Sequence, residues 1–177
     1  MLSPTRRVAA SAKQRLRKMS EKRKVLFLCT GNSCRSQMAE AILRHLGQDR
    51  FEALSAGSMP AGFVHPLANE AMSRLNIPMT EQTSKSWNEF AAVRLDAVIT
   101  LCDAVAEETC PTWPGEPLTV LWSTPDPAYH FGTDDERLEF AASVAERLRL
   151  KIQGLVDLNW STDRAQLSKR LEFLAEI

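Results

Sequence analysis

The stretch VLFLCTGNSCRS, residues 25–36, decides the fold of this chain. Its first four residues form an apolar run that is typical of a short buried strand. A polar loop that contains Gly31 and Asn32 follows, and from Ser36 the apolar residues recur at helical spacing until Gly47. A strand, a loop and a helix in this order predict the opening of a βαβ unit.

The same alternation of strands and helices continues outward from this stretch. Further strands are predicted at residues 51–55, 97–101 and 118–122, and helices at residues 66–75 and 136–155. The apolar spacing within residues 162–177 predicts one more helix. Alternating elements of this kind imply an α/β fold, with a parallel sheet, helices on both of its faces and right-handed crossovers.

Length and charge limit the class of protein. At 177 residues, the chain is long enough for one well-buried domain and short for two. Lys and Arg number 22, as do Asp and Glu, but nine basic residues and a single acid fall within residues 1–24. The acidic remainder argues against a nucleic-acid partner. We expect residues 1–23 to form a flexible basic leader, with an organelle transit peptide as the other interpretation.

The cysteines are expected to be reactive rather than structural. No run approaches the ~18–20 apolar residues that cross a membrane, and no export signal is recognisable, so a cytoplasmic location without membrane contact is expected. In a reducing compartment, cysteines are more often catalytic or metal-binding than paired in disulfides. Their spacing does not match short zinc knuckles, so no metal is predicted. The four are Cys29, Cys34, Cys102 and Cys110.

The loop from Cys29 to Arg35 has the features of an oxyanion site. It follows the first strand, and ligands of open α/β sheets bind beyond the carboxyl ends of the strands. Backbone N–H groups and the positive end of the helix dipole would converge on an anion there. A thiol at a helix N-terminus beside a guanidinium is favoured as the nucleophilic thiolate, and arginine can hold two oxygens at once. The predicted oxyanion-binding residues are Thr30, Gly31, Asn32, Ser33, Cys34, Arg35 and Ser36.

The quoted stretch resembles the signature loop of the low-molecular-weight protein tyrosine phosphatase family, which includes the thiol-dependent arsenate reductases. That family's fold, a four-stranded parallel sheet with helices on both faces in a flavodoxin-like three-layer sandwich, agrees with the strand count. The resemblance implies that Cys29 is the nucleophile and that Asp126, before Pro127, is the general acid. The other interpretation of Asp126 is a turn residue.

Two further features are similar to the arsenate reductase branch of that family. The Asp126-Pro127 pair lies mid-chain and is followed by Ala128, whereas the phosphatases have it near the C-terminus and follow it with an aromatic residue. The segment VITLCDAVAEETCPTWPG, residues 98–115, resembles the redox segment of the reductases. It places Cys102 at the end of the third strand, at the same sheet edge as Cys29, with Cys110 further along.

The resemblance implies a thiol relay. Cys29 attacks arsenate, Cys102 attacks Cys29 and releases arsenite, and Cys110 attacks Cys102. No cofactor is expected to stay bound, and thioredoxin, glutaredoxin or a low-molecular-weight thiol would reduce the final disulfide. Two alternatives remain: a phosphatase in which Cys102 and Cys110 are small buried residues, and a non-catalytic oxyanion or redox sensor.

Three expectations complete the sequence analysis. Residues 24–160 would form the catalytic domain of a monomer, and residues 161–177 a helical extension. Cys34 is either a partner for Cys29 in a protective disulfide or a packed residue. Some reductases of the family carry a potassium site, but Lys85 stands where that site would need an acid, so the cation is not predicted; the corresponding residues here are Asn32, Glu40 and Ser55.

Overall fold

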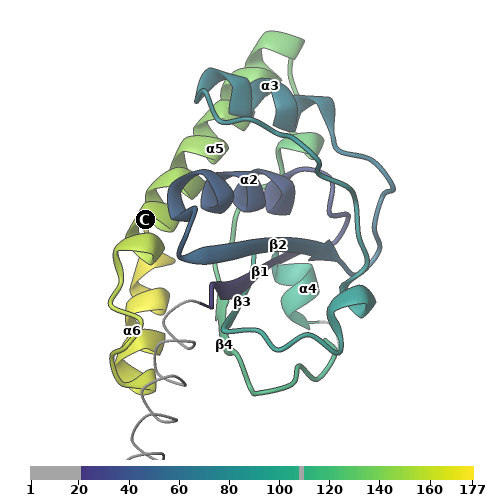
Figure 1. The fold of residues 1–177 in the computed structure, drawn as a ribbon. Coiled ribbons are helices and arrows are strands. Elements are labelled where there is room, and N and C mark those ends of the chain that lie inside the picture. The colour runs from purple at the N-terminus through teal and green to yellow at the C-terminus, as the bar shows by residue number, and fades with distance from the viewer. Residues whose placement is uncertain (1–20, 108–109) are drawn as a thin grey trace, which may run out of the picture.

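The sheet has four parallel strands. The structure is a computed structural model that describes residues 21–107 and 110–177. The strands are β1 (Arg23–Cys29), β2 (Phe51–Gly57), β3 (Ala97–Thr100) and β4 (Leu118–Leu121). They lie in the order β2-β1-β3-β4, and each neighbouring pair is parallel (Figure 1). The predicted α/β class and four-stranded parallel sheet are therefore confirmed.

Helices connect and cover these strands. The α-helices are α2 (Arg35–Gly47), α3 (Pro66–Arg74), α4 (Asp103–Glu107), α5 (Asp134–Asp157) and α6 (Arg164–Leu174). Two short 3₁₀ helices, η1 (Trp87–Phe90) and η2 (Pro127–Tyr129), lie in the connections. The start of α5 is fixed by a capping box, in which Thr133 and Glu136 each satisfy the other's backbone N–H. The apolar spacing predicted this helix from residue 136, whereas the capping box places its start at Asp134.

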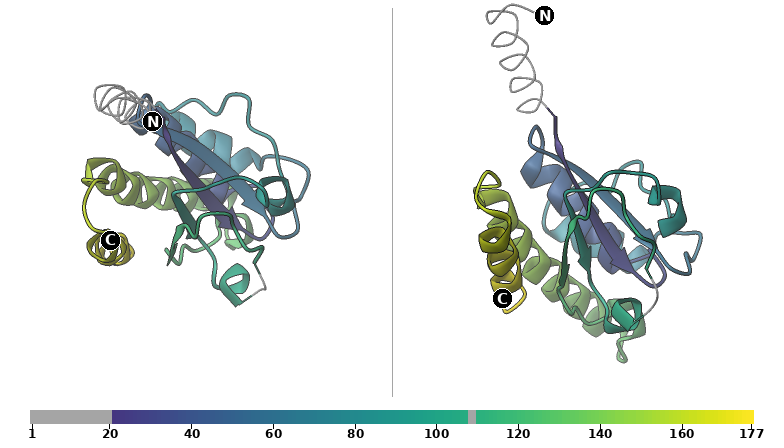
Figure 2. Two further views of the ribbon diagram at one scale, coloured as in Figure 1. Left: turned by 60° about the horizontal axis from the view of Figure 1, so that its bottom comes forward. Right: turned by 90° about the horizontal axis from the view of Figure 1, so that it is seen from below.

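Both faces of β1 are buried, which explains its continuous apolar sequence. Val25 and Phe27 point into the larger core cluster, beneath α2 and α5, while Leu26 and Leu28 point into a smaller cluster on the opposite face. The smaller cluster is closed by η1, α4 and the segment after it, through residues such as Trp87, Val105 and Trp113. The two further views show α5 and α6 on one side of the sheet and α4 away from them (Figure 2).

The predicted C-terminal helix is present as α6, and it is docked. Leu167, Leu171 and Leu174 are buried in the larger cluster. The two helices approach closely at Gly154 of α5, where an added Cβ would lie 2.4 Å from Leu174 Cδ2. The division of the chain into leader, catalytic domain and extension stays a prediction, and residues 1–20 of the leader lie outside the described residues.

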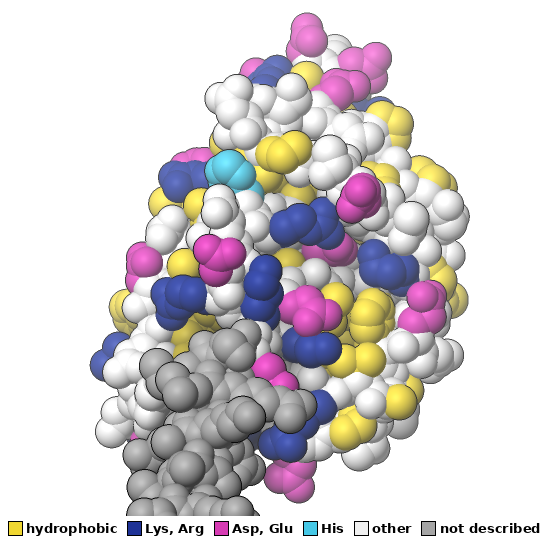
Figure 3. Space-filling model, in the orientation of Figure 1, with side chains coloured by type: hydrophobic (Ala, Val, Ile, Leu, Met, Phe, Trp, Pro, Cys, Tyr) yellow, Lys and Arg dark blue, Asp and Glu magenta, His cyan; other side chains and the backbone are white. Residues whose placement is uncertain are grey.

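The charged side chains on one face of the surface are mixed in sign. On the face that Figure 3 shows, Lys and Arg side chains are interspersed with Asp and Glu side chains. A broad basic surface, which nucleic-acid binding would need, is not seen on that face. Among the described residues, no helix combines the length and the apolar character needed to span a membrane.

The register of the sheet gathers three segments at its carboxyl edge. Cys29 is the last residue of β1, and Leu28 pairs with Thr100 of β3. The chain beyond β3 continues this edge, because the backbone N–H of Leu101 donates to the carbonyl of Leu28 at 2.8 Å. Beyond β4, the N–H of Thr124 donates to the carbonyl of Leu101 at 3.0 Å. The residues after β1, β3 and β4 therefore converge at one place.

Candidate active site

The loop between β1 and α2 is shaped by close packing against β2. An added Cβ at Gly57 would lie 2.4 Å from the carbonyl oxygen of Thr30, so this position of β2 admits only glycine. Asn32 adopts a φ of 42°, a region that asparagine tolerates better than most residues. The segment that follows β2 lies along the loop, because the N–H of Met59 donates to the Thr30 carbonyl and that of Ala61 to the Gly31 carbonyl.

Asn32 organises the hydrogen bonds behind the loop, and the direction of these bonds is fixed. Its side chain is fully buried, and Oδ1 accepts the backbone N–H of Lys85 at 2.7 Å. Since a backbone N–H can only donate, the amide nitrogen Nδ2 must face the other way. It donates to Ser36 Oγ and to Ser55 Oγ, each at 2.9 Å.

The hydrogen bond from Asn32 to Ser36 also bears on the contact between Ser36 and Cys29. Cys29 is 2% exposed, and its Sγ lies 2.9 Å from Ser36 Oγ. Because Ser36 Oγ already accepts a hydrogen from Asn32, its own hydrogen is available for the sulfur. A donated hydrogen bond favours the charged form of the sulfur, which is the nucleophilic form. Ser36 Oγ and Cys29 Sγ are therefore in contact, and Ser36 can serve as the donor when the sulfur is a thiolate.

Arg35 is held at the first turn of α2 with part of its guanidinium unpaired. Its Nη1 donates to the carbonyl of Thr124 at 3.1 Å, and its Nη2 lies 2.5 Å from Asp126 Oδ2. Its Nε is buried and has no hydrogen-bond partner among the described residues. A buried donor without a partner is costly, so a ligand with acceptor oxygens would stabilise it. The Nε and Nη2 edge is thus suited to two oxygens of an anion.

Asp126 serves in a turn and also reaches the loop. Its Oδ1 accepts the N–H of Ala128 at 3.0 Å, which caps η2, and its Oδ2 pairs with Arg35. Asp126 therefore has the contacts of a turn residue, while its role as the general acid stays a prediction. The pair brings a carboxyl group to the oxyanion loop, which is the placement that a general acid requires.

Cys102 lies near Cys29, and Thr30 is the residue that connects them. Cys102 precedes α4 and is 7% exposed, and its Sγ lies 3.5 Å from Thr30 Oγ1. Thr30 directly follows Cys29, so the two cysteines occupy neighbouring places at the carboxyl edge of the sheet. Cys110 is half-buried and lines a groove together with Trp113 and Leu121. The link between these cysteines includes residues 108–109, which lie outside the described residues.

Cys34 is a packed thiol. It is 2% exposed and belongs to the larger core cluster beneath α2. Burial, and then the negative charges of Asp126 and Cys29, raise the pKa of the Cys34 thiol to about 12. Cys34 is therefore protonated at neutral pH and is unsuited to be a nucleophile. Of the two sequence interpretations, the geometry favours the packed residue.

A buried carboxylate lies behind the loop. Glu40 is 4% exposed, accepts hydrogen bonds from Ser55 and Arg44, and has the ammonium of Lys85 3.4 Å from its Oε2. Lys85 also donates to the Thr83 carbonyl at 2.7 Å. The Lys85 side chain thus supplies a positive charge at the place considered for a cation. Among the described residues, no group of three His, Cys, Asp or Glu side chains is arranged for a metal ion.

The sequence did not single out two residues of this site. Thr124 supplies the carbonyl that holds Arg35, and Gln37 is fully buried with Nε2 donating to the carbonyls of Asn32 and Thr83, each at 2.9 Å. A backbone carbonyl leaves no trace in the residue type. The signal for Gln37 was a polar residue at an inward position of an amphipathic helix.

Comparison with known proteins points to one family. A model of the family described as low molecular weight phosphotyrosine protein phosphatase matches residues 24–158. The arsenate reductase of Halalkalibacterium halodurans is 38% identical over 136 residues, which cover 77% of this chain and 96% of that protein.

Two solved structures extend the comparison. One, described as an arsenate reductase in the phosphate-binding state, has a TM-score of 0.63 and 31% identity, over 76% of this chain and 96% of its own. The thioredoxin-dependent arsenate reductase of Corynebacterium glutamicum has a TM-score of 0.52 and 28% identity, over 81% of this chain and 72% of its own. The resemblance carried by residues 25–36 is confirmed, and the chain belongs to the low molecular weight phosphotyrosine protein phosphatase family.

Proposed function

We propose that this protein is an arsenate reductase that uses a relay of three cysteines. Cys29 opens the oxyanion loop, Arg35 presents an unpaired Nε to an anion, and Asp126 brings a carboxyl group to the same place. These features suit any tetrahedral oxyanion. The observation that carries the reductase is the position of Cys102, whose sulfur lies 3.5 Å from the hydroxyl of Thr30. Hydrolysis of a phosphoester has no use for a second thiol there.

The proposed first step forms a bond between sulfur and arsenic. The Cys29 thiolate attacks the arsenic of arsenate, and one oxygen departs as water after taking a proton from Asp126. Arg35 and the loop amides stabilise the charge on the remaining oxygens. Because Asp126 Oδ2 pairs with Nη2 of Arg35, an anion on this edge of the guanidinium competes with Asp126.

The later steps move two electrons to arsenic and then a disulfide along the chain. The Cys102 thiolate attacks the sulfur of Cys29, the electron pair of the sulfur–arsenic bond stays on arsenic, and arsenite leaves. A Cys29–Cys102 disulfide remains. Cys110 then attacks Cys102, which frees Cys29 as a thiolate, and an external dithiol reduces the Cys102–Cys110 disulfide.

We propose thioredoxin as the external reductant. The support is the Corynebacterium glutamicum relative, which is described as thioredoxin-dependent. Glutaredoxin and low-molecular-weight thiols are the other candidates. The monomeric state and the cytoplasmic location stay predictions.

The second candidate function is hydrolysis of small phosphoesters. It is favoured by the same Cys29, Arg35 and Asp126 geometry and by the family name. The two functions are separated by comparing the wild type with Cys102→Ser in two assays. One follows arsenite formation with thioredoxin, thioredoxin reductase and NADPH, and the other follows hydrolysis of an aryl phosphate. Loss of arsenite formation with retained hydrolysis supports the reductase, whereas rapid hydrolysis without arsenite formation by the wild type overturns it.

A further inference from the structure

The helix α6 lies outside the part of the chain that matches the family. The family match ends at residue 158, and α6 begins at Arg164. Nevertheless, α6 is packed into the same core as the sheet, against β4 and α5. Two hydrogen bonds connect this helix with residues near the carboxyl edge of the sheet and with α5.

Two side chains from the body of the protein cap the end of α6. The last four carbonyls of a helix have no partner within the helix. One of them belongs to Leu171, and it accepts the indole N–H of Trp122 at 2.9 Å. Just beyond the helix, the carbonyl of Ala175 accepts a hydrogen bond from Lys151 Nζ at 2.8 Å. Both donors are almost completely buried, Trp122 at 0% exposure and Lys151 at 2%.

Trp122 connects this helix end with Arg35 through one further residue. It directly follows β4, and its carbonyl accepts the hydroxyl of Thr124 at 2.7 Å. The carbonyl of Thr124 in turn accepts Arg35 Nη1 at 3.1 Å. The position of the Arg35 guanidinium therefore depends on where Trp122 holds the segment between β4 and Asp126.

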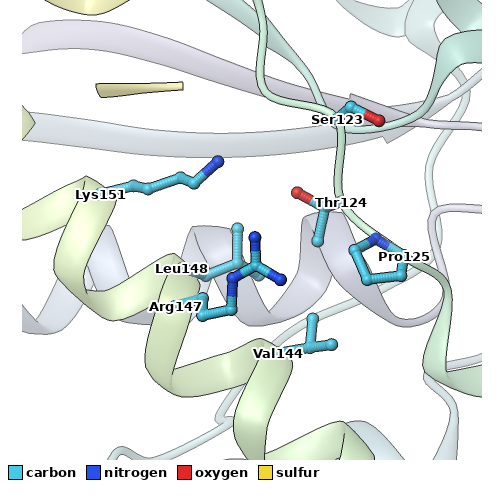
Figure 4. A pocket seen from close by; sticks show the side chains of 7 residues that line it. All are labelled: Ser123, Thr124, Pro125, Val144, Arg147, Leu148 and Lys151. Atoms are coloured by element: carbon cyan, nitrogen blue, oxygen red, sulfur yellow. The ribbon is translucent and has the colours of Figure 1, made fainter. Parts of the chain in front are cut away.

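That segment is not packed tightly against the neighbouring helix. A small cavity separates it from α5, and Figure 4 shows the side chains of Arg147 and Lys151 extending from α5 toward Thr124. The lining residues are Ser123, Thr124, Pro125, Val144, Arg147, Leu148 and Lys151. The segment is held from the other side by the backbone N–H groups of Trp122 and Thr124, which donate to the carbonyls of Thr100 and Leu101, and by the buried indole of Trp122.

We propose that α6 is a positioning element of the oxyanion site, which acts through Trp122 and Thr124 on Arg35. The inference rests on the oxyanion site of the proposed function but does not require arsenate to be reduced. Trp122 is a positioning residue in this proposal, since it does not touch the anion itself. Loss of its hydrogen bond to α6 would loosen Arg35 and weaken anion binding.

The test uses two tryptophans with matched environments. Trp160 is 8% exposed, lies in the same core cluster and donates its indole N–H to the carbonyl of Leu155 at 3.1 Å. It packs on Phe51 at the start of β2, away from the carboxyl edge. Trp122→Phe and Trp160→Phe each remove one buried indole hydrogen bond, so both are expected to lower the melting temperature.

Only Trp122→Phe is expected to weaken the oxyanion site. The dissociation constant of inorganic phosphate, measured by calorimetry on the reduced protein, should rise by about 2- to 10-fold, the range of one buried hydrogen bond. If the wild type reduces arsenate, KM for arsenate in Trp122→Phe should rise by the same factor while kcat stays within about 2-fold. Equal phosphate affinity in Trp122→Phe and Trp160→Phe overturns the proposal.

A second variant covers the case in which Trp122→Phe fails to fold. Lys151→Met keeps the length of the side chain and removes the other cap of α6, without altering Trp122 or Thr124. It should raise the phosphate dissociation constant in the same direction, by a smaller factor, and an unchanged constant overturns the proposal. If the wild type binds phosphate but forms no arsenite, the proposed reductase fails while this test of α6 still stands.

Discussion

Arg35 Nη2 lies 2.5 Å from Asp126 Oδ2, so the side chain suited to hold an anion is paired with the side chain suited to supply a proton. The two side chains are 10% and 21% exposed, which leaves the pair little shielded by water. An oxyanion that enters the loop therefore competes with Asp126 for the same guanidinium. This competition makes opposite predictions for binding and for chemistry.

Asp126→Asn should separate the effect of this residue on anion binding from its effect on the chemical step. The substitution removes the negative charge that competes for Arg35, so the dissociation constant of phosphate should fall. The first chemical step should slow by about 10²-fold or more, because general acid catalysis typically contributes that much. Calorimetry with phosphate and single-turnover formation of the arsenate adduct measure the two effects. Weaker phosphate binding in the variant would show that Asp126 supports the anion rather than competes with it.

Ser36→Ala tests the hydrogen bond to the nucleophile. Ser36 Oγ, which accepts a hydrogen bond from Asn32, can donate its own hydrogen to a Cys29 thiolate, and hydrogen bonds to charged groups contribute about 1.5–3 kcal/mol. The rate constant for alkylation of Cys29 by iodoacetamide at pH 7 should therefore fall by about 10-fold or more. Mass spectrometry of the modified peptide identifies the site. Ser55→Ala, which alters the same network one step away from the sulfur, is the control and should change this rate less.

Thr30→Val should affect the relay more than the first attack. Valine keeps the shape of threonine but removes the hydroxyl that lies 3.5 Å from Cys102 Sγ. Formation of the Cys29–Cys102 disulfide should slow by about 2- to 10-fold, the range of one ordinary hydrogen bond. Hydrolysis of an aryl phosphate should change little, since the contact proposed between Thr30 and the anion is made by its backbone N–H, which valine keeps. Thr30→Ser keeps the hydroxyl and should restore the disulfide rate.

The buried thiol of Cys34 should make stability depend on alkaline pH. An ordinary cysteine has a pKa near 9, whereas burial raises the pKa of Cys34 to about 12. Between these values the unfolded thiol loses its proton and the folded thiol keeps it, so folding stability falls as pH rises. The free energy of unfolding relative to Cys34→Ala should decrease by up to about 1.4 kcal/mol per pH unit. Urea denaturation of both proteins from pH 8 to 11 tests this, and parallel curves would contradict it.

Lys85→Met should destabilise the fold through Glu40. The variant leaves a buried carboxylate with one cation fewer, and breaking a largely buried ion pair that keeps other partners should cost about 1–2 kcal/mol. Lys24→Met is the matched control, because its ion pair with Glu52 has a similar length of 3.3 Å but is 39% and 45% exposed. The control should lose no more than about 0.5 kcal/mol in urea denaturation. Equal losses of unfolding free energy in the two variants would show that burial of Glu40 does not strengthen the contribution of its ion pair to stability.

The local sequence was sufficient for the fold and for the places of Cys29 and Cys102 at the carboxyl edge of the sheet. The apolar run 25–28 and the change to helical spacing after Ser36 predicted the first βαβ turn, and α2 differs only in starting at Arg35. Cys102 was placed correctly because residues that follow parallel strands share one sheet edge. These predictions needed only residue type and spacing.

The supports of the site were not predictable, because they join residues far apart in the sequence. Arg35 and Thr124 are separated by 89 residues, and Trp122 and Leu171 by 49. In both cases the acceptor is a backbone carbonyl, which every residue type provides. The roles assigned to Cys29, Arg35 and Cys102 stay predictions until the variants are measured.

The arrangement of β1, β3 and β4 side by side has a consequence for the protein during its synthesis. Cys29 follows β1, while the segment that carries Asp126 follows β4, and these parts meet only after β3 has paired with both neighbouring strands. A growing chain that has emerged only as far as α4 already contains three of the four cysteines, Cys29, Cys34 and Cys102, but not the carboxylate partner of Arg35. The Arg35–Asp126 ion pair can therefore form only after translation has passed β4.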